Sequence, residues 1–239
     1  MLKLPIDERR LYAFAASQGL SGRDQTDEGY ILHALLSALF DAAAPKPFSL
    51  QRKGQDASLL AYASQPWDAF EKAARLYAAP DVYETVRWEA AASKPMPDNF
   101  GQDQCLDFFV RILPMSRAGR QHPTFRPGAE VDVFLLKAEA DRAASKPDRE
   151  TIYENWLNER LARGGAETIA IETVRRRRSV LLRKRADGTR HISTQQPDID
   201  MAGTLIVRDP AAFRACLMRG VGRHRAFGYG MILLKPSNG

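Results

Sequence analysis

Two side chains near the start of the chain, Tyr30 and His33, place a phenol and an imidazole three positions apart. In a helix this spacing puts both on one flank, beside Ser37 and away from the leucine stripe. Histidine, with an ordinary pKa of about 6.5, exchanges protons at neutral pH, while tyrosine or lysine can position groups or balance charge. These residue types suit metal-free cleavage of RNA, in which the ribose 2′-hydroxyl attacks the adjacent phosphate and the enzyme supplies a proton acceptor, a proton donor and a cation. The alternative is an ordinary surface or core histidine.

A glycine-rich loop lies near the other end of the chain, at residues 219–230 (RGVGRHRAFGYG). Glycine lets a backbone approach a ligand closely, and arginine and histidine supply donors for phosphate. The spacing matches neither the dinucleotide fingerprint nor the phosphate loop, so a nucleotide cofactor is not expected. We predict contacts to RNA, the alternative being glycines that only permit tight helix-to-strand packing. The predicted RNA-binding residues of this loop are Arg219, Gly220, Gly222, Arg223, His224, Arg225 and Gly228.

A basic segment at 175–190 (RRRRSVLLRKRADGTR) holds eight Arg or Lys against the single Asp187. Asp187 and Gly188 form a strong turn signal between strand-like arms, which predicts a hairpin. A basic hairpin can reach the phosphates of an RNA stem, whose deep groove offers shape and charge. The alternative is a solvated hairpin without a partner. The residues predicted to bind RNA here are Arg175, Arg176, Arg177, Arg178, Arg183, Lys184 and Arg185.

The composition of the 239-residue chain also favours a nucleic-acid partner. Its 35 Lys and Arg exceed its 29 Asp and Glu, and the formal charge of +6 favours an anionic partner such as nucleic acid. The two cysteines, Cys105 and Cys216, form no metal or disulfide pattern, and no histidine or carboxylate cluster has metal-ligand spacing. The sequence shows neither a signal-peptide core nor a membrane-spanning run. We therefore expect a cytoplasmic protein with no metal, no cofactor and no membrane partner.

The elements that must position these residues follow from hydrophobic periodicity. Residues 27–40 predict a helix with a leucine stripe, which the prolines of 45–47 prevent from continuing. A second helix is predicted at 67–78, with strands at 2–6, 46–52, 58–64, 82–90 and 105–113. This β-α-β-β-α-β order is the ferredoxin-like pattern.

A second unit is predicted after residues 114–130, which are rich in Pro, Gly and Arg. It has a helix at 149–163 and another that Asp209 caps, Pro210 begins and Gly220 ends. Its predicted strands are 167–174, 178–185, 201–207 and 227–235. The predicted domains are therefore 1–120, carrying Tyr30 and His33, and 121–239, carrying the basic hairpin and the glycine-rich loop.

Four segments together resemble the CasE family of CRISPR repeat endoribonucleases, the crRNA-processing subunit of the type I-E Cascade complex. They are Asp27–His33 (DEGYILH), Tyr153–Leu157 (YENWL), Gly203–Pro210 (GTLIVRDP) and the closing motif Gly220–Gly230. The similarity covers nearly the whole chain, and the closing motif is the most specific of the four.

The resemblance implies an α+β fold of two tandem ferredoxin-like (RRM-like) domains with an RNA-binding cleft between them. It implies metal-independent cleavage of the CRISPR repeat 3′ of its hairpin, leaving a 2′,3′-cyclic phosphate. The family's catalytic histidine and tyrosine match His33 and Tyr30. Some members use a lysine shortly after that histidine, and the first lysine here is Lys46, which becomes the third catalytic candidate. The implied partners are pre-crRNA, mature crRNA and other Cascade subunits.

Two other functions stay open. The departure at the lysine position keeps open a non-catalytic scaffold that binds the RNA hairpin within a larger complex; tight binding without any product at stoichiometric protein would identify it. A metabolic enzyme that holds a mononucleotide in the glycine-rich loop is the third hypothesis. Saturation by a nucleotide with no affinity for RNA would identify that one.

Overall fold

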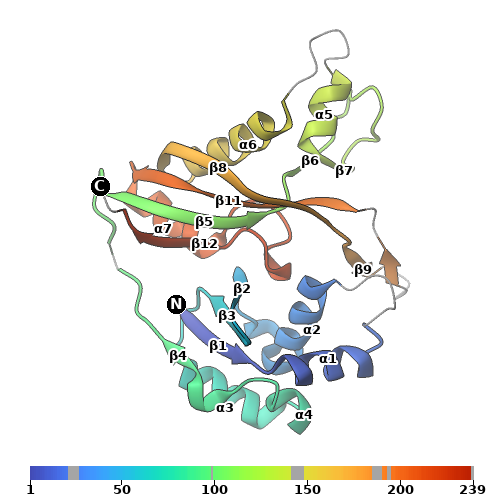
Figure 1. The fold of residues 1–239 in the computed structure, drawn as a ribbon, viewed down its shortest axis with the longest axis vertical. Helices are drawn as coiled ribbons and strands as arrows, with labels where there is room; N and C mark the ends of the chain where they lie inside the picture. Colours follow the sequence, from blue (N-terminus) through green and yellow to red (C-terminus); the bar gives the residue numbers. More distant parts are fainter. Residues whose placement is uncertain (21–26, 98, 141–147, 185–189, 193–194, 238–239) are drawn as a thin grey trace.

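Two four-stranded antiparallel sheets, each with its own helices, form the two halves of the molecule (Figure 1). The computed structural model describes residues 1–20, 27–97, 99–140, 148–184, 190–192 and 195–237. The strand orders are β2-β3-β1-β4 and β12-β5-β11-β8. In both sheets the first strand of the unit lies between the third and the fourth, and helices connect the first strand to the second and the third to the fourth. This arrangement confirms the predicted α+β fold of two tandem ferredoxin-like domains.

The N-terminal unit contains residues 2–93. Its strands are β1 (Leu2–Ile6), β2 (Phe48–Lys53), β3 (Asp56–Ala61) and β4 (Ala92–Ser93). Its helices are α1 (Glu8–Ser17), α2 (Glu28–Phe40), η1 (Asp41–Ala43), α3 (Trp67–Tyr77), α4 (Pro80–Tyr83) and η2 (Trp88–Ala90). Helix α1 was not predicted, although Asp7 caps it by accepting a hydrogen bond from the N–H of Arg10.

The second half of the predicted N-terminal unit was partly wrong. Residues 82–90 form α4, a turn and η2 rather than a strand, because Pro80 is pre-organised for the first turn of a helix. Only Val86 pairs with the sheet, through a bridge to Ile6. The predicted strand at 105–113 exists as β5 (Cys105–Ile112), but it pairs with β11 and β12 in the second sheet. We therefore propose a domain boundary within 94–104 instead of at residue 120.

The C-terminal unit begins with β5 and contains the remaining elements. Its strands are β6 (Met115–Arg117), β7 (Glu130–Asp132), β8 (Ala166–Ser179), β9 (Leu182–Lys184), β10 (Arg190–Ile192), β11 (Gln196–Val207) and β12 (Ile232–Pro236). Its helices are α5 (Val133–Ala140), α6 (Arg149–Arg163), α7 (Pro210–Arg219) and η3 (Arg225–Phe227). Asp209 caps α7 and Gly220 ends it, as predicted. The expected strands 167–174 and 178–185 are instead one long strand, β8, followed by the short β9.

The predicted basic hairpin consists of β9 and β10, which pair antiparallel to each other. The turn predicted at Asp187 and Gly188 lies outside the described residues. In Figure 1 β9 stands at the margin between the two halves, near α2. The hairpin therefore starts from the C-terminal sheet and reaches the helix that carries His33.

Each half contributes a side chain to the apolar core of the other. Leu182 of β9 belongs to the apolar core of the N-terminal unit, and Tyr62, which follows β3, belongs to the core of the C-terminal unit. The Tyr62 hydroxyl also donates a 2.7 Å hydrogen bond to the backbone carbonyl of Ile232. Because the halves pack together, side chains from both halves can keep fixed positions relative to each other within one site. Among the described residues, no helix has the length and apolar character needed to cross a membrane.

Candidate functional site

Asp27 fixes the start of the helix that carries both catalytic candidates. Its side chain accepts a hydrogen bond from the N–H of Tyr30 at 2.9 Å, which caps α2. Its second oxygen accepts the N–H of Leu182 at 2.8 Å, so the same carboxylate ties the base of the basic hairpin to α2. Burial raises the pKa of Asp27, while the hydrogen bonds from Leu182 and Tyr30 oppose that change. One buried carboxylate thus sets the position of the helix relative to the hairpin.

Tyr30 and His33 meet the glycine-rich loop at Phe227. The His33 ring lies 4.7 Å from the Phe227 ring, and the Tyr30 ring stacks on the same ring at 6.0 Å, measured between centroids. The two candidate side chains are 6.4 Å apart and meet edge to face. They line a cavity of about 380 Å³ together with Asp27, Leu181, Leu182, His224 and Phe227. The structure therefore brings together residues from distant parts of the sequence, 30–33 and 224–227.

Lys46, the third catalytic candidate, lies on the approach to this cavity. It is exposed and lines an adjoining cavity of about 610 Å³ that shares His224 and Phe227 with the first. Burial lowers the pKa of His33, and the positive charge of Lys46 lowers it further. His33 is therefore held in its neutral form at neutral pH, the form that accepts a proton.

The glycines of the loop serve its own packing. Gly220 and Gly228 are buried, and their contact with RNA stays a prediction. Gly228 has a φ of +80°, in the left-handed region that favours glycine, and a Cβ there would lie 3.1 Å from the Phe48 ring. Gly29 matters in a different way, because a Cβ at this position would collide with the backbone oxygen of Phe227. Glycine at position 29 lets the loop lie directly against α2.

The cations of the loop divide into paired and exposed ones. Arg223 forms a 2.5 Å ion pair with Glu130 of β7, and His224 lies 3.3 Å from the other oxygen of the same carboxylate. Arg225 donates to the backbone carbonyl of Arg219 at 2.8 Å, and the side chain of Arg219 is exposed. Gly222 packs against Trp156 of α6, with the ring 2.8 Å from the position of a Cβ. The loop thus presents cations along the cavity that Lys46 lines.

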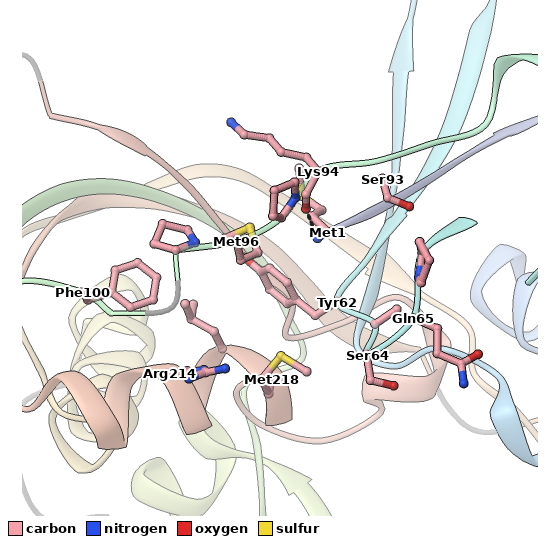
Figure 2. A pocket seen from close by; sticks show the side chains of 15 residues that line it. Met1, Tyr62, Ser64, Gln65, Ser93, Lys94, Met96, Phe100, Arg214 and Met218 are labelled. Carbon is pink, nitrogen blue, oxygen red and sulfur yellow. Dashed lines mark hydrogen bonds between the residues drawn. The ribbon is translucent and has the colours of Figure 1, made fainter. Parts of the chain in front are cut away.

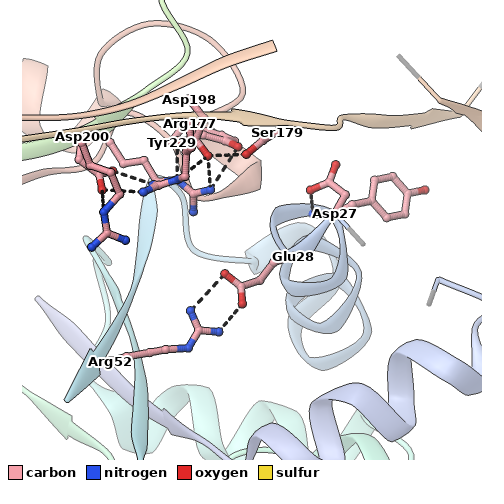
Figure 3. Close-up of polar contacts among 11 residues, drawn as sticks. Asp27, Glu28, Arg52, Arg177, Ser179, Asp198, Asp200 and Tyr229 are labelled. Atoms are coloured by element: carbon pink, nitrogen blue, oxygen red, sulfur yellow. Dashed lines mark hydrogen bonds and ion pairs between the residues drawn. The ribbon is translucent and has the colours of Figure 1, made fainter. Parts of the chain in front are cut away.

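Within the four successive arginines, Arg177 points inward and forms a buried network (Figure 3). It pairs with Asp198 at 3.0 Å and with Asp200 at 2.8 Å, and Ser179 donates to Asp198 as well. From the other side Arg111 makes a two-bond pair with Asp198. Burial alone would raise the pKa of Asp198, but the hydrogen bonds from Arg111 hold it below its ordinary value. Arg177 therefore belongs to this network, and its contact with RNA stays a prediction.

The remaining basic candidates are more exposed. The side chains of Arg175 and Arg176 are 70% and 52% exposed, with long ion pairs of 4.0 Å to Asp200 and 3.8 Å to Glu150. Arg178 is exposed in β8. Arg183 and Lys184 belong to β9, but their side chains are not described, and Arg185 lies outside the described residues. An exposed cation in a long ion pair can exchange its carboxylate partner for a phosphate at little cost in free energy.

A further cavity, of about 560 Å³, lies between the two halves at a different place (Figure 2). The side chains of Met1, Tyr62, Met96, Phe100 and Met218 give it a largely apolar wall, with Lys94 and Arg214 among its lining residues. None of the predicted site residues lines it. The chemistry predicted from the sequence therefore belongs to the two cavities that meet at His224 and Phe227.

Sequence reasoning missed two residues of this site. Glu130, which holds Arg223 and His224, gave no signal, because a single carboxylate in an irregular segment has no pattern. Asp27 belongs to a recognised motif and to a helix start, but its second hydrogen bond, to Leu182, required the fold. Among the described residues, no cluster of three or more histidine, cysteine or carboxylate side chains is arranged to hold a metal ion.

Comparisons with known proteins agree with this architecture. A family model described as CRISPR associated protein matches residues 1–236. This chain belongs to that family. The family resemblance predicted from the sequence is thereby confirmed. A search of curated proteins finds no match.

Solved structures of CRISPR proteins share the fold of this family member over nearly its whole length. The CRISPR endoribonuclease Cse3 bound to a 19-nucleotide RNA has a TM-score of 0.63 and 19% identity, covering 98% of this chain and 99% of that one. Cas6e from Escherichia coli K-12 has a TM-score of 0.55 and 15% identity, covering 99% and 100%. A chain of a CRISPR RNA-guided surveillance complex has a TM-score of 0.54 and 15% identity, also covering 99% and 100%. At these identities the similarity establishes the fold.

Proposed function

We propose that this protein is an endoribonuclease that cleaves CRISPR repeat RNA 3′ of its hairpin without a metal ion. The observation that carries the proposal is the meeting of His33 and Tyr30 with the cation-bearing glycine-rich loop around one cavity. The family assignment supports it, as does the fold shared with an endoribonuclease, Cse3, that was solved with RNA bound. The product would carry a 2′,3′-cyclic phosphate.

The roles of the residues follow from their surroundings. His33, kept neutral by burial and by Lys46, accepts the proton of the attacking 2′-hydroxyl. Tyr30 forms part of the cavity wall beside it and positions the reacting nucleotide. Lys46 and the loop arginines supply positive charge where negative charge develops on the phosphate. Side chains of this chain can thus provide the proton acceptor and the positive charge that the transesterification needs.

Cleavage is tested with a labelled repeat hairpin under single-turnover conditions in EDTA. We expect a cut 3′ of the stem that a single 2′-deoxy substitution at the cleavage position abolishes. His33→Ala is expected to lose cleavage and keep hairpin binding. His122→Ala, at a histidine that lines neither of the two cavities, should keep both. Cleavage at the wild-type rate by His33→Ala would remove His33 from the mechanism. Restoration of activity only by added metal would overturn metal independence.

Binding is tested through its salt dependence. For a duplex, the slope of log K against log salt becomes shallower by about 0.9 for each phosphate that the protein no longer neutralises. We expect a smaller slope for the double variant Arg175→Ala, Arg176→Ala, whose side chains are largely exposed. An unchanged slope would mean that these arginines face solvent. Tight binding without any product at stoichiometric protein would favour a non-catalytic scaffold instead.

We also propose that the protein acts as a subunit of a larger complex that keeps the cleaved RNA. A chain with this fold occurs in a solved CRISPR RNA-guided surveillance complex, which supports the proposal. Purification through a tag on this chain from its host should recover further protein subunits together with mature crRNA. Recovery of the chain without RNA would contradict it.

A further inference from the structure

His224 is a second imidazole on the wall of the cavity that holds His33. Both residues line the same 380 Å³ space, and both rings contact Phe227, at 4.7 Å for His33 and 6.0 Å for His224. His224 also lines the adjoining cavity that Lys46 and the loop arginines surround. The side chain is therefore placed where a phosphate in either space can reach it.

The backbone and a carboxylate hold His224 in this orientation. Its φ of +58° lies in the left-handed region, which is uncommon outside glycine and which asparagine, aspartate and histidine adopt more often than other residues do. Glu130 lies 3.3 Å from its Nε2, and both side chains are only 13% exposed. A residue kept in a rare conformation and paired with a buried carboxylate is typical of a functional position.

The charged partners of the two histidines differ in sign. His33 faces the positive charge of Lys46, and burial and that charge lower its pKa. His224 contacts the carboxylate of Glu130, which Arg223 shares. Lys46, Arg219 and Arg225 line the adjoining cavity around it, and Asp27 lines the cavity that both histidines share. A neighbouring cation favours a neutral imidazole, and a neighbouring carboxylate favours an imidazolium. Two titratable groups whose surroundings favour opposite protonation states can act as an acid and base pair.

We propose that His224, oriented by Glu130, is the proton donor of the reaction, while His33 is the proton acceptor. This inference rests on the proposed function. The 2′-oxygen of the ribose attacks phosphorus and forms a P–O2′ bond while His33 takes the 2′-hydroxyl proton. The P–O5′ bond breaks, and the imidazolium of His224 gives its proton to O5′. The products are a 2′,3′-cyclic phosphate and a 5′-hydroxyl, and exchange with water restores both histidines.

A structural role predicts a different behaviour. If the pair of His224 and Glu130 only locks the glycine-rich loop, its loss would slow cleavage whatever the leaving group. A proton donor matters only when the leaving group needs a proton. Replacing O5′ by sulfur removes that need, because a thiol has a pKa of about 8.5, far below that of an alcohol, and leaves as a thiolate.

The test measures single-turnover cleavage of the repeat hairpin with oxygen or with bridging sulfur at the 5′ position of the scissile phosphate. His224→Asn is the variant of choice, because asparagine tolerates the left-handed backbone at this position. We expect it to cleave the oxygen substrate about 10²–10⁴-fold more slowly than the wild type, and the sulfur substrate within about tenfold of it. Glu130→Gln should show the same pattern with a smaller loss.

Two controls separate the outcomes. His33→Ala should lose cleavage of both substrates, because a proton acceptor is needed in each case, and His122→Ala should cleave both normally. Equal loss on both substrates by His224→Asn, or no loss on either, would overturn the assignment of His224 as proton donor and leave the proposed function intact. A wild-type protein that cleaves neither substrate would reject the proposed function, and this inference with it.

Discussion

Replacement of Asp27 by alanine should destabilise the protein more than the loss of an ordinary helix cap. The Asp27 side chain is only 4% exposed and accepts two backbone hydrogen bonds, from Tyr30 within α2 and from Leu182 at the base of the hairpin. Loss of an N-cap costs about 1 kcal/mol. A buried N–H left without an acceptor costs roughly 1–3 kcal/mol more. We therefore expect Asp27→Ala to lower the free energy of unfolding by about 2–4 kcal/mol.

Asp148 provides the matched control, because it caps α6 in the same way but is exposed. Its side chain accepts from the N–H of Thr151 at 2.8 Å within its own helix. Asp148→Ala should therefore cost about 1 kcal/mol. Urea denaturation followed by circular dichroism measures both variants. An Asp27→Ala variant that loses no more stability than Asp148→Ala would refute the claim that this carboxylate ties the hairpin to α2.

Three further predictions follow from the site and its supports. Lys46→Met should raise the pKa of His33. Because the cleavage rate falls as His33 gains a proton, the rate of this variant should begin to fall at a higher pH than that of the wild type. An unmoved acid limb of the pH–rate profile would contradict the influence of Lys46. Arg177→Ala should lower the free energy of unfolding by about 2–4 kcal/mol in urea, because it leaves buried carboxylates without one partner; unchanged stability would contradict the network. Gly29→Ala should cost about 1–3 kcal/mol and slow cleavage, since its Cβ meets the Phe227 oxygen, whereas Gly119→Ala, with open space around it, should change neither; equal effects would contradict this packing.

Local patterns were sufficient at α2 and α7, where the determining interactions are local. Asp209, Pro210 and Gly220 set the ends of α7 as predicted, because a cap, a fixed φ and a positive φ act within a few residues. The helix at 27–40 was found in the same way. The strand at 105–113 was also found, but its partner was not, because an alternating strand can pair with either sheet.

The roles of the arginines at 175–178 depended on the fold. Their sequence indicates only a cluster of charge, and alternation along β8 then turns Arg177 toward Asp198 and Asp200 while Arg176 and Arg178 face the other way. The two aspartates are distant in sequence, so no local pattern could separate an RNA contact from an ion pair. Only the fold shows that Arg177 pairs with these two buried carboxylates.

The sequence by itself determined the family, the two ferredoxin-like units and the identity of Tyr30 and His33 as candidates. Motif residues and hydrophobic periodicity carry that information along the chain. Only the tertiary structure decided that His33 meets the glycine-rich loop, that Lys46 acts on its charge and that Glu130 holds His224 across the same cavity. These relations join residues far apart in sequence, and packing of the two sheets, which leaves no local trace, brings them together.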